Sequence, residues 1–503
     1  MRFIYITIVR LLYLILFAWF AFELSKGYLQ LFGICVSNHP LYPITGSFRN
    51  PGPFGCMMSV GICLLTSYYI RIKTTSNQDV KSRLLCWIIG FIDVTAVVIL
   101  PSIQSRSSIL ALFFSLILIT IGTEQIKTKV QPLFKSYGIL LLFGIIILGA
   151  GVYLLKKPSA DGRMFIDKIC INAIFENGWK GSGRHSFGEV YSSTQHDYFK
   201  KQINNKGTDD LDWTAIEEHD RLVSDCPDNA FNEYLFIGIE YGPFAMFIFI
   251  AIIVMAIVVS YRRGTIWCYG LTALAVFALF SYPLHVWQFQ ILFPVLITAS
   301  LLDGDKINKK SKKLELTILM TALITVSFVT INRIPQIKKN RLANEMWKRT
   351  ESLYRLKGYE YVVNECDTLL PYMKHDEGFL FAYGQSLNKL GYYIKSDSIL
   401  QLGTKISSDP MFWNVMGNNS LAQGKYREAE ERYKHAFYMV PNRLYPLYLL
   451  AKLYHTEGDT ARFQKMADKV ETFIPKVESV NTERLRSEIR EIRAGYLPQI
   501  DQE

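Results

Sequence analysis

The sequence has little charge for its length. Aspartate, glutamate, lysine and arginine make up 20% of the 503 residues, whereas hydrophobic residues make up 50%. Globular domains carry about 25% charged residues, and here the apolar residues are clustered along the chain. The net charge of +11 could indicate nucleic-acid binding, but much of the excess lies in short clusters beside apolar segments. This distribution is typical of a polytopic membrane protein and argues against a nucleic-acid partner.

The signatures of several enzyme classes are also missing. The eight cysteines have no metal-site spacing, and His185, His196 and His219 lack the helical spacing of a zinc site. No Gly-x-Ser-x-Gly nucleophile elbow occurs. A nucleotide loop at Gly181–Arg184 is excluded because no Gly-Lys-Ser/Thr follows, and its glycines suit backbone that packs closely against a neighbour. We therefore expect neither a metal ion nor another cofactor.

About nine apolar segments are each near the ~20 residues that a helix needs to cross the hydrocarbon core of a membrane. The N-terminal segment lacks a small-residue cleavage site, so we interpret it as a retained first span and not as a removed signal peptide. The expected spans are 5–30, 55–72, 84–102, 107–123, 136–155, 236–260, 265–281, 286–302 and 314–331.

The lysines and arginines between these spans indicate the orientation of the chain. If the spans alternate in direction, the four loops that are rich in lysine and arginine all fall on one side, which is then the cytoplasmic side. This topology places the N-terminus inside and the segments 156–235 and 336–503 outside. We therefore expect an all-α protein with a polytopic membrane domain over residues 1–335 and a large extracytoplasmic loop at 156–235.

The loop 156–235 is too long for a simple connection, and loops of this length are usually functional or disordered. It contains Trp179, Trp213 and several other aromatic residues, and we expect it to be ordered because disordered segments are poor in aromatics. Cys170 and Cys226 also lie in it. The sequence leaves a disulfide between these cysteines open, because it does not give their separation.

After residue 335 the composition becomes that of a soluble helical domain with an internal repeat. The stretch Trp413–Pro441 resembles a tetratricopeptide repeat, in which large and small residues interlock between two antiparallel helices. Equivalent turns recur at intervals of 33, 33 and 34 residues, at Gly358, Gly391, Gly424 and Gly458. The pattern predicts an α-solenoid over 336–503 whose concave surface binds a protein partner. A role in scaffolding or stabilisation alone is the alternative.

Two arginines are candidates for binding a phosphate or pyrophosphate. Arg106, in Ser-Arg-Ser-Ser, lies at the outer end of a span, where an arginine costs about 2.5–3.5 kcal/mol and usually has a partner or a function. A side chain that snorkels to the headgroups is the alternative. Arg163 lies just outside the next span. Guanidinium groups bind phosphoryl oxygens in a bidentate manner, so two of them near one membrane surface can form a phosphate cradle.

Further polar residues are expected at the same outer surface. The stretch before the second span is rich in proline and glycine and predicts a turn that presents Arg49 and Asn50. Glu240 lies near the outer end of the sixth span, about two helical turns from Asn232 and Glu233. These three side chains share one helix face if the helix starts early.

Taken together and in this order, the motifs resemble the O-antigen ligase and polymerase family of bacterial envelopes. The resemblance covers about residues 20–300, and the repeats match a variant with a tetratricopeptide tail. The motifs are Thr45–Pro51, Ser105–Ser107, Gly162-Arg163 before a Gly-x-Gly-x-x-x-Phe loop, and Asn232 followed by Gly242.

The resemblance implies a metal-independent glycosyltransferase of the bacterial inner membrane that acts on the periplasmic side. Such an enzyme moves a glycan from undecaprenyl pyrophosphate to a lipid or protein acceptor: lipid A core, a growing polysaccharide or a protein hydroxyl. Arg106 and Arg163 would bind the pyrophosphate, on which charge develops as it leaves. Asn232 and Glu233 are further catalytic candidates, and the substrate-binding candidates are Arg49, Asn50, Arg184, His185 and Glu240.

One position departs from the pattern of the family. The ligases usually have a histidine directly before the asparagine, as candidate base for the acceptor hydroxyl, and here this residue is Phe231. Glu233, His185 or Glu240 could serve instead, and only their geometry decides. The departure weakens the case for ligation to lipid A core and leaves polymerisation and protein glycosylation open.

Two functions of other classes remain open. A non-catalytic membrane scaffold would recruit envelope-assembly partners through the repeats, with Phe231 marking lost chemistry. A transporter or flippase for the same lipid would place charged residues deep inside several spans, and apart from Arg10 there are few. Substitution of Arg106 or Arg163 separates transferase from scaffold, because only the transferase would lose glycan transfer.

Overall fold

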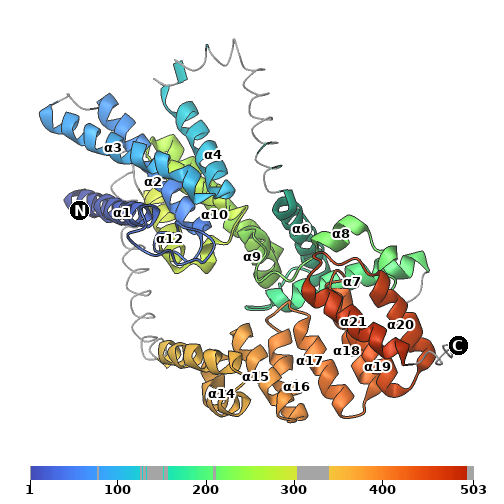
Figure 1. Ribbon diagram of the computed structural model, residues 1–503. Coiled ribbons are helices and arrows are strands. Elements are labelled where there is room, and N and C mark those ends of the chain that lie inside the picture. Colours follow the sequence, from blue (N-terminus) through green and yellow to red (C-terminus); the bar gives the residue numbers. More distant parts are fainter. Residues whose placement is uncertain are drawn as a thin grey trace. The chain divides into compact units, whose positions relative to one another are not determined.

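The computed structural model describes residues 2–75, 79–124, 157–207, 211–302 and 339–495, with isolated positions at 127, 128, 132, 151 and 154. These residues are mainly helical and contain no strand, which confirms the all-α prediction for the described part of the chain (Figure 1). Two expected spans, 136–155 and 314–331, lie outside the described residues except for positions 151 and 154.

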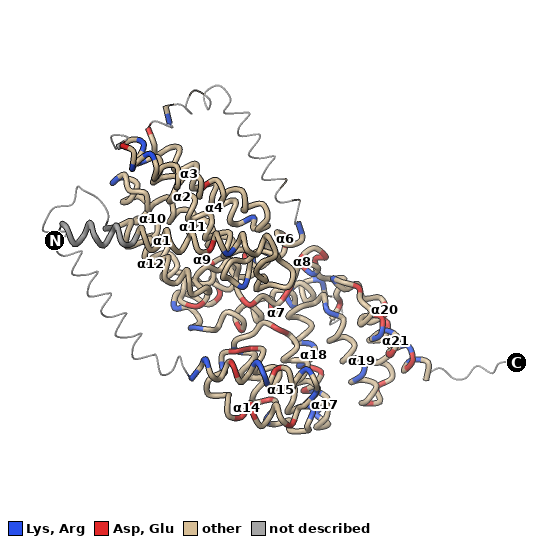
Figure 2. Tube along the Cα trace, turned by 60° about the vertical axis from the view of Figure 1, so that its left-hand side comes forward, with Lys and Arg blue, Asp and Glu red and all other residues tan. Residues whose placement is uncertain are grey.

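The chain divides into two compact units. The first contains Met1–Lys157, Phe231–Tyr234 and Phe244–Thr325, and the second contains Pro158–Ala230, Leu235–Pro243 and Val326–Glu503. Most of the long polar loop, residues 158–230, thus belongs to the same unit as the C-terminal helices, which the sequence does not predict. Figure 2 shows few charged residues along the helices of the first unit and many along those of the second. A boundary at residue 335 between a membrane domain and a repeat domain stays a prediction.

The first unit is a bundle of apolar helices. Its members are α1 (Arg2–Leu31), α2 (Pro51–Thr75), α3 (Val80–Ile103), α4 (Arg106–Gly122), α10 (Pro243–Arg263), α11 (Trp267–Ala278) and α12 (Trp287–Leu302), with the 3₁₀ turn η2 (Pro283–His285) before α12. α2 packs against α3, α4 and α11, and α11 also packs against α4 and α12. Small residues allow this close approach, since a Cβ at Gly55 of α2 would meet Ser105 and Ser108.

Three of the described helices are long and apolar enough to cross a membrane by length and composition. They are Pro51–Thr74, Val80–Ile103 and Pro243–Arg262, and the shorter apolar helices are Arg106–Gly122, Trp267–Ala278 and Trp287–Leu301. The most apolar window of α2 is 72% buried, against 22% for α3 and 17% for α10. α2 is therefore interior, and the other two present apolar surface outward. These helices support a membrane protein, and the total of about nine spans stays a prediction.

The sixth expected span, 236–260, is interrupted. α9 (Glu233–Tyr241) ends before Gly242, whose φ is +89°, and α10 begins at Pro243. Glycine adopts the left-handed conformation at low cost, and proline fits the first turn of the following helix, so this pair ends one helix and begins another. The apolar helix therefore starts at Pro243, and Glu240 lies in α9 and not in the span.

The second unit combines helices of the long loop with those of the C-terminal part. The loop contributes α6 (Lys157–Asn177), α7 (Phe187–Lys206), η1 (Trp213–Ala215) and α8 (Glu218–Val223). The C-terminal helices are α14 (Tyr359–Met373), α15 (Glu377–Lys389), α16 (Tyr393–Thr404), α17 (Met411–Ala422), α18 (Tyr426–Met439), α19 (Tyr445–Glu457), α20 (Thr460–Thr472) and α21 (Val480–Ala494). From α14 to α20 each helix packs against the next, and α21 packs against α19 and α20.

Glycines occupy the turns between successive C-terminal helices. Gly391, Gly424 and Gly458 have φ values of +83°, +71° and +82°, which glycine adopts more readily than other residues. Inside a helix pair, a Cβ at Gly417 of α17 would meet the ring of Tyr433 of α18, so the expected interlocking of small and large residues is present. The turns thus agree with the repeat spacing, and the assignment to the tetratricopeptide class stays a prediction.

The long loop packs directly on the C-terminal helices of its own unit. α7 contacts α18, where the rings of His196 and His435 stack with centroids 4.4 Å apart. Arg221 of α8 is buried, donates a hydrogen bond to the carbonyl of Ile474 (2.6 Å) and lies 4.9 Å from the ring of Trp213. The described part of the loop is helical and packed, in agreement with the expectation of an ordered segment.

Candidate active site

The turn before α2 is fixed by two polar side chains of α1. The Oε1 atom of Gln30 accepts a hydrogen bond from the N–H of Gly46 (2.8 Å), and Oε2 of Glu23 accepts one from the N–H of Ser47 (2.9 Å). Gly46 has a φ of +57°, and its missing Cβ leaves room for the ring of Phe54. The predicted turn is confirmed, and it leads into two candidate residues directly before α2.

Asn50 connects the start of α2 to the segment between α11 and α12. Its Oδ1 accepts a hydrogen bond from the N–H of Gly52 (3.0 Å), as an N-cap residue does, and its Nδ2 donates to the hydroxyl of Tyr282 (3.2 Å). Arg49 beside it is exposed. Asn50 therefore positions α2 and the Tyr282 segment relative to each other.

Arg106 is the first residue of α4 and is half-buried. The start of α4 lies against the start of α2, because Oγ of Ser108 donates to the carbonyl of Gly52 (3.2 Å) and Oγ of Ser59 donates to the carbonyl of Ser108 (2.8 Å). Helix N-termini carry partial positive charge and N–H groups without helical partners. Two adjacent helix N-termini, one of which begins with an arginine, suit the binding of an anion such as pyrophosphate.

Glu233 and His285 form an acid–base pair at the start of α9. Glu233 is 2% exposed, and its Oε2 accepts a hydrogen bond from the N–H of Leu284 (2.9 Å). Its Oε1 lies 3.6 Å from Nδ1 of His285, whose side chain is 34% exposed. This separation exceeds a hydrogen bond of about 2.7–3.2 Å, and catalytic contacts often shorten when substrate binds. A carboxylate at Nδ1 orients an imidazole so that Nε2 can accept the proton of a hydroxyl.

Phe231 has an unusual backbone conformation, with a φ of +50° that bulky residues rarely adopt. Its ring packs edge-on against Tyr282, with centroids 5.6 Å apart, and the ring of Tyr282 packs edge-on against His285 at 6.1 Å. The Oδ1 atom of Asn232 accepts a hydrogen bond from the N–H of Tyr234 (3.2 Å) and so caps α9. Phe231 offers no acid–base chemistry, but it supports the segment that carries His285.

The glycine-rich loop of the second unit is held by Glu240. The Oε1 atom of Glu240 accepts a hydrogen bond from the N–H of His185 (2.7 Å), and its carbonyl accepts one from Gly183 (2.9 Å). A Cβ at Gly181 would meet the backbone of Gly242. The close packing expected of these glycines is confirmed for Gly181, and the buried carboxylate of Glu240 orders the loop backbone.

His185 faces the C-terminal helices of the second unit. Its ring stacks on that of His375, with centroids 4.6 Å apart. Burial, followed by repulsion from His375 and Arg184, lowers the pKa of His185 below its ordinary value. His185 is therefore a weaker base than a histidine with the ordinary pKa. Arg184 is exposed, and Arg163 is half-buried in α6.

The structure thus divides the predicted site residues between the two units. In the first unit Asn50 and Glu233 both bond to the segment Tyr282–His285, and Arg106 begins the helix beside Asn50. Arg49 and Asn232 also belong to the first unit, whereas Arg163, Arg184, His185 and Glu240 belong to the second.

His285 and Tyr282 are not among the residues that the sequence predicts for the site. They lie in a short segment between two apolar spans and belong to no motif, and His285 stands 52 positions after Glu233. Folding alone brings such distant residues together. The available signal was a histidine close to a proline in a short loop on the expected outer side.

No disulfide links Cys170 and Cys226, because all eight cysteines are free. Cys170 is buried in α6, whereas the sulfur of Cys226 lies 2.9 Å from Nη2 of Arg443. The two thiols therefore have separate environments. Within the described residues, no group of three or more His, Cys, Asp or Glu side chains is placed to hold a metal ion.

A comparison with protein families gives a match in the middle of the chain. Residues 91–250 match the family model described as O-antigen ligase. The matched range contains Arg106, Arg163 and Glu233 and ends before His285. No curated protein compared with the chain gave a match. Together with the apolar helices, the match supports the O-antigen ligase family and a membrane protein with a glycosyltransferase-type role in surface polysaccharide assembly.

Proposed function

We propose that the protein is a glycan transferase of the bacterial inner membrane that moves a saccharide from undecaprenyl pyrophosphate to an acceptor on the periplasmic side. The proposal is carried by the pair of Glu233 and His285, 3.6 Å apart, in the unit that also contains Arg106. The match of residues 91–250 to O-antigen ligases supports the same class of reaction. The clustering of lysine and arginine in loops on one side supports the orientation.

The proposed reaction is a displacement at the anomeric carbon of the donor sugar. The acceptor oxygen forms a bond to this carbon while the bond from the carbon to the pyrophosphate oxygen breaks, and the pyrophosphate leaves with the electron pair. The hydroxyl proton passes to Nε2 of His285, and Glu233 stabilises the imidazolium that forms. Arg106 and the N-termini of α2 and α4 stabilise the charge on the leaving pyrophosphate. We propose a metal-independent reaction because these groups supply the positive charge.

The class of acceptor separates two versions of this function. A ligase or polymerase would extend a lipid-linked polysaccharide, whereas a protein O-oligosaccharyltransferase of the same family would modify a protein hydroxyl. The C-terminal helices of the second unit are the part of the chain that we expect to bind a protein. We propose that these helices are tetratricopeptide repeats and bind that protein or a partner enzyme.

The proposal is tested by profiling envelope glycans in a deletion strain that is complemented with variants of the gene. We expect Arg106→Ala and His285→Ala to lose the surface glycan and to accumulate the lipid-linked precursor, with the protein at its normal level in the membrane. Arg163→Ala tests the role that the sequence predicts for this residue. His219→Ala, which changes an exposed histidine of the second unit, is the matched control and should restore the glycan.

The outcomes separate the alternatives. Full restoration of the glycan by both Arg106→Ala and His285→Ala would contradict the transferase and favour a scaffold that works through the C-terminal helices. Mass spectrometry of the glycan-bearing fraction distinguishes a lipid-anchored polysaccharide from a glycoprotein and thereby identifies the acceptor class.

A further inference from the structure

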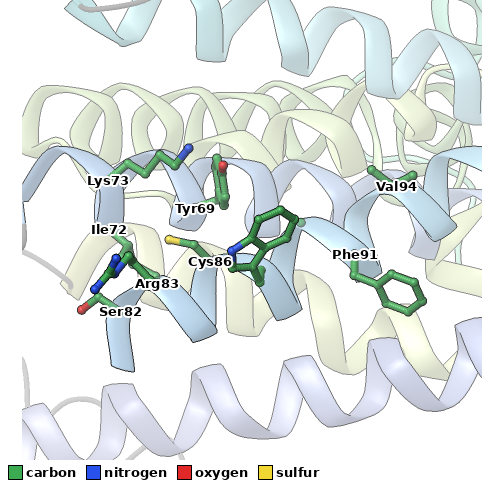
Figure 3. Close-up of a pocket in the computed structure, with 10 residues that line it drawn as sticks. Tyr69, Ile72, Lys73, Ser82, Arg83, Cys86, Phe91 and Val94 are labelled. Carbon is green, nitrogen blue, oxygen red and sulfur yellow. The ribbon is translucent and has the colours of Figure 1, made fainter. Parts of the chain in front are cut away.

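A groove between α2 and α3 has cationic side chains at one end and apolar side chains at the other. Its volume is 580 Å³, within the range of about 300–1,000 Å³ that is typical of ligand pockets. Figure 3 shows Lys73, Ser82 and Arg83 at one end of the groove and Phe91 and Val94 at the other. The groove therefore has the polarity of an amphiphile.

The cationic end of the groove lies where α2 ends and α3 begins. Lys73 is in the last turn of α2, and Arg83 is close to the start of α3. The ammonium of Lys73 stands 4.7 Å from the centre of the Tyr69 ring, which limits the positions it can take. From residue 71 to 83 the described chain has four lysines or arginines and one acidic residue, Asp79, which caps α3. This end is thus a positively charged surface at the boundary of two apolar helices.

The apolar end is formed by a row of exposed side chains on α3. Trp87, Phe91 and Val94 follow at helical spacing and are 79%, 71% and 63% exposed. Gly90 lies among them, and a Cβ there would meet only Tyr69, at 3.9 Å, so this glycine keeps the groove open. An exposed apolar row on a helix long enough to cross a membrane is suited to contact with a hydrocarbon chain.

The groove is distinct from the proposed active site. Asn50 stands directly before α2 and Arg106 shortly after α3, whereas Lys73 and Arg83 stand at the opposite ends of these helices. α2 has 25 residues, which is about 37 Å at 1.5 Å per residue. This length exceeds the hydrocarbon core of about 30 Å. A headgroup at Lys73 and Arg83 therefore lies in the other leaflet from the pyrophosphate of the proposed donor.

We propose that the groove binds an anionic phospholipid, with its phosphate between Lys73 and Arg83 and one acyl chain along Trp87 and Phe91. Lysine and arginine at a membrane surface attract anionic headgroups, and the arginine fork matches phosphoryl oxygens. Tyrosine and tryptophan prefer the same interfacial layer. The two cations attract a zwitterionic lipid less strongly than an anionic one, and a soluble phosphate has no acyl chain to contact the apolar row.

Native mass spectrometry of the full-length protein in detergent tests the proposal, with phosphatidylglycerol and phosphatidylcholine of identical acyl chains as probes. A cation at a membrane surface contributes about fivefold to the affinity for an anionic lipid. The double variant Lys73→Gln/Arg83→Gln should therefore bind phosphatidylglycerol about 30-fold more weakly, with phosphatidylcholine unaffected. The control Arg71→Gln/Lys81→Gln removes the same charge from exposed positions that do not line the groove. Its affinity for phosphatidylglycerol should fall less than fivefold.

A second variant tests the groove without changing charge. Gly90→Leu places a side chain into the groove and should weaken the binding of phosphatidylglycerol at least tenfold. The melting temperature should be retained, because the new Cβ makes only an ordinary contact and leucine favours a helix over glycine. Val98→Leu, at an exposed position of α3 that does not line the groove, is its control and should bind normally.

Four results would each overturn the proposal. The first is equal binding of the two lipids by the wild type, and the second is normal binding of phosphatidylglycerol by Gly90→Leu. The third is an equal loss of affinity for phosphatidylglycerol in the two double variants. The fourth is displacement of phosphatidylglycerol by soluble glycerol phosphate at the same concentration. The last of these would identify a phosphate site in place of a lipid site. None of them depends on glycan transfer, so the proposed function can fail or hold independently.

Discussion

Substitution of Glu233 and His285 tests whether the two residues act as one unit. General base catalysis contributes about 10²–10⁴-fold to a rate, so His285→Ala should lower kcat/KM for glycan transfer by this factor. A unit charge 3.6 Å away contributes about 4–5 kcal/mol at an effective dielectric constant of about 20. His285 is 34% exposed, and screening by solvent reduces this value to about 2 kcal/mol. Glu233→Gln should therefore lower kcat/KM about 30-fold.

The double variant decides whether Glu233 acts through His285. If it does, adding Glu233→Gln to His285→Ala lowers the rate no further. The assay is single-turnover transfer of a labelled glycan from its lipid carrier in proteoliposomes. Gln290→Ala is the control, because Nε2 of Gln290 donates to the carbonyl of Leu284 (2.8 Å) and the variant loosens the same turn without changing the pair. We expect Gln290→Ala to lower kcat/KM for glycan transfer less than threefold.

Two results would refute this reasoning. A further loss of about 30-fold in the double variant would mean that Glu233 and His285 act independently. A normal rate in His285→Ala would exclude His285 as the base. The level of folded protein in the membrane distinguishes either result from unfolding, which is relevant because Glu233 is buried.

Three further predictions concern the second unit. Burial, followed by the neighbouring His196, lowers the pKa of His435 to about 3. The unfolded chain then takes up a proton more readily, so stability should fall as the pH drops from about 6.5 toward 3, by about 3 kcal/mol at pH 4. Thermal unfolding measures this fall, and His435→Gln should flatten it. Gly242→Ala should destabilise the unit by at least 1 kcal/mol more than Gly183→Ala in denaturant titrations. Both glycines have positive φ, which costs about 1–2 kcal/mol for alanine, but only at Gly242 would the Cβ meet a backbone carbonyl. Arg221→Met should cost about 1–3 kcal/mol, because the carbonyl of Ile474 loses its charged donor, and hydrogen exchange in α8 should increase. Unchanged exchange there would contradict the assigned contact.

The features that sequence analysis predicted depend on residues that are close in the chain. The apolar runs 55–72 and 84–102 correspond to α2 and α3 within a few residues, because hydropathy and helix length are local properties. The turn before α2 follows from its own proline and glycine content. The break at Gly242 was missed although its signal is local, because a hydropathy window continues through a single glycine that apolar residues follow.

The features that were missed depend on contacts between distant segments. Arg221 of the long loop donates to the carbonyl of Ile474, 253 positions away. No pattern in the loop marks this contact, so the loop could be predicted to be ordered but not to pack on the C-terminal helices. His185 was a candidate base by residue type alone, and its stacking on His375 became visible only in the folded chain.

The position of Phe231 bears on whether the chain has lost its chemistry. A histidine at this position would present its own imidazole, and a phenylalanine cannot. However, the ring of Phe231 packs on Tyr282, and the segment from Tyr282 presents His285 to Glu233, two residues after Phe231. In the proposed function the imidazole beside Glu233 therefore comes from the segment Tyr282–His285 and not from position 231. The ring of Phe231 supports that segment. The buried carboxylate of Glu233 accepts a hydrogen bond from the N–H of Leu284 and lies 3.6 Å from His285, so it holds this segment and is also placed to orient the imidazole. Phe231→His in the His285→Ala background follows from this argument. If it restores glycan transfer, the base can act from either position, and if it does not, the acceptor hydroxyl is aligned with His285 alone.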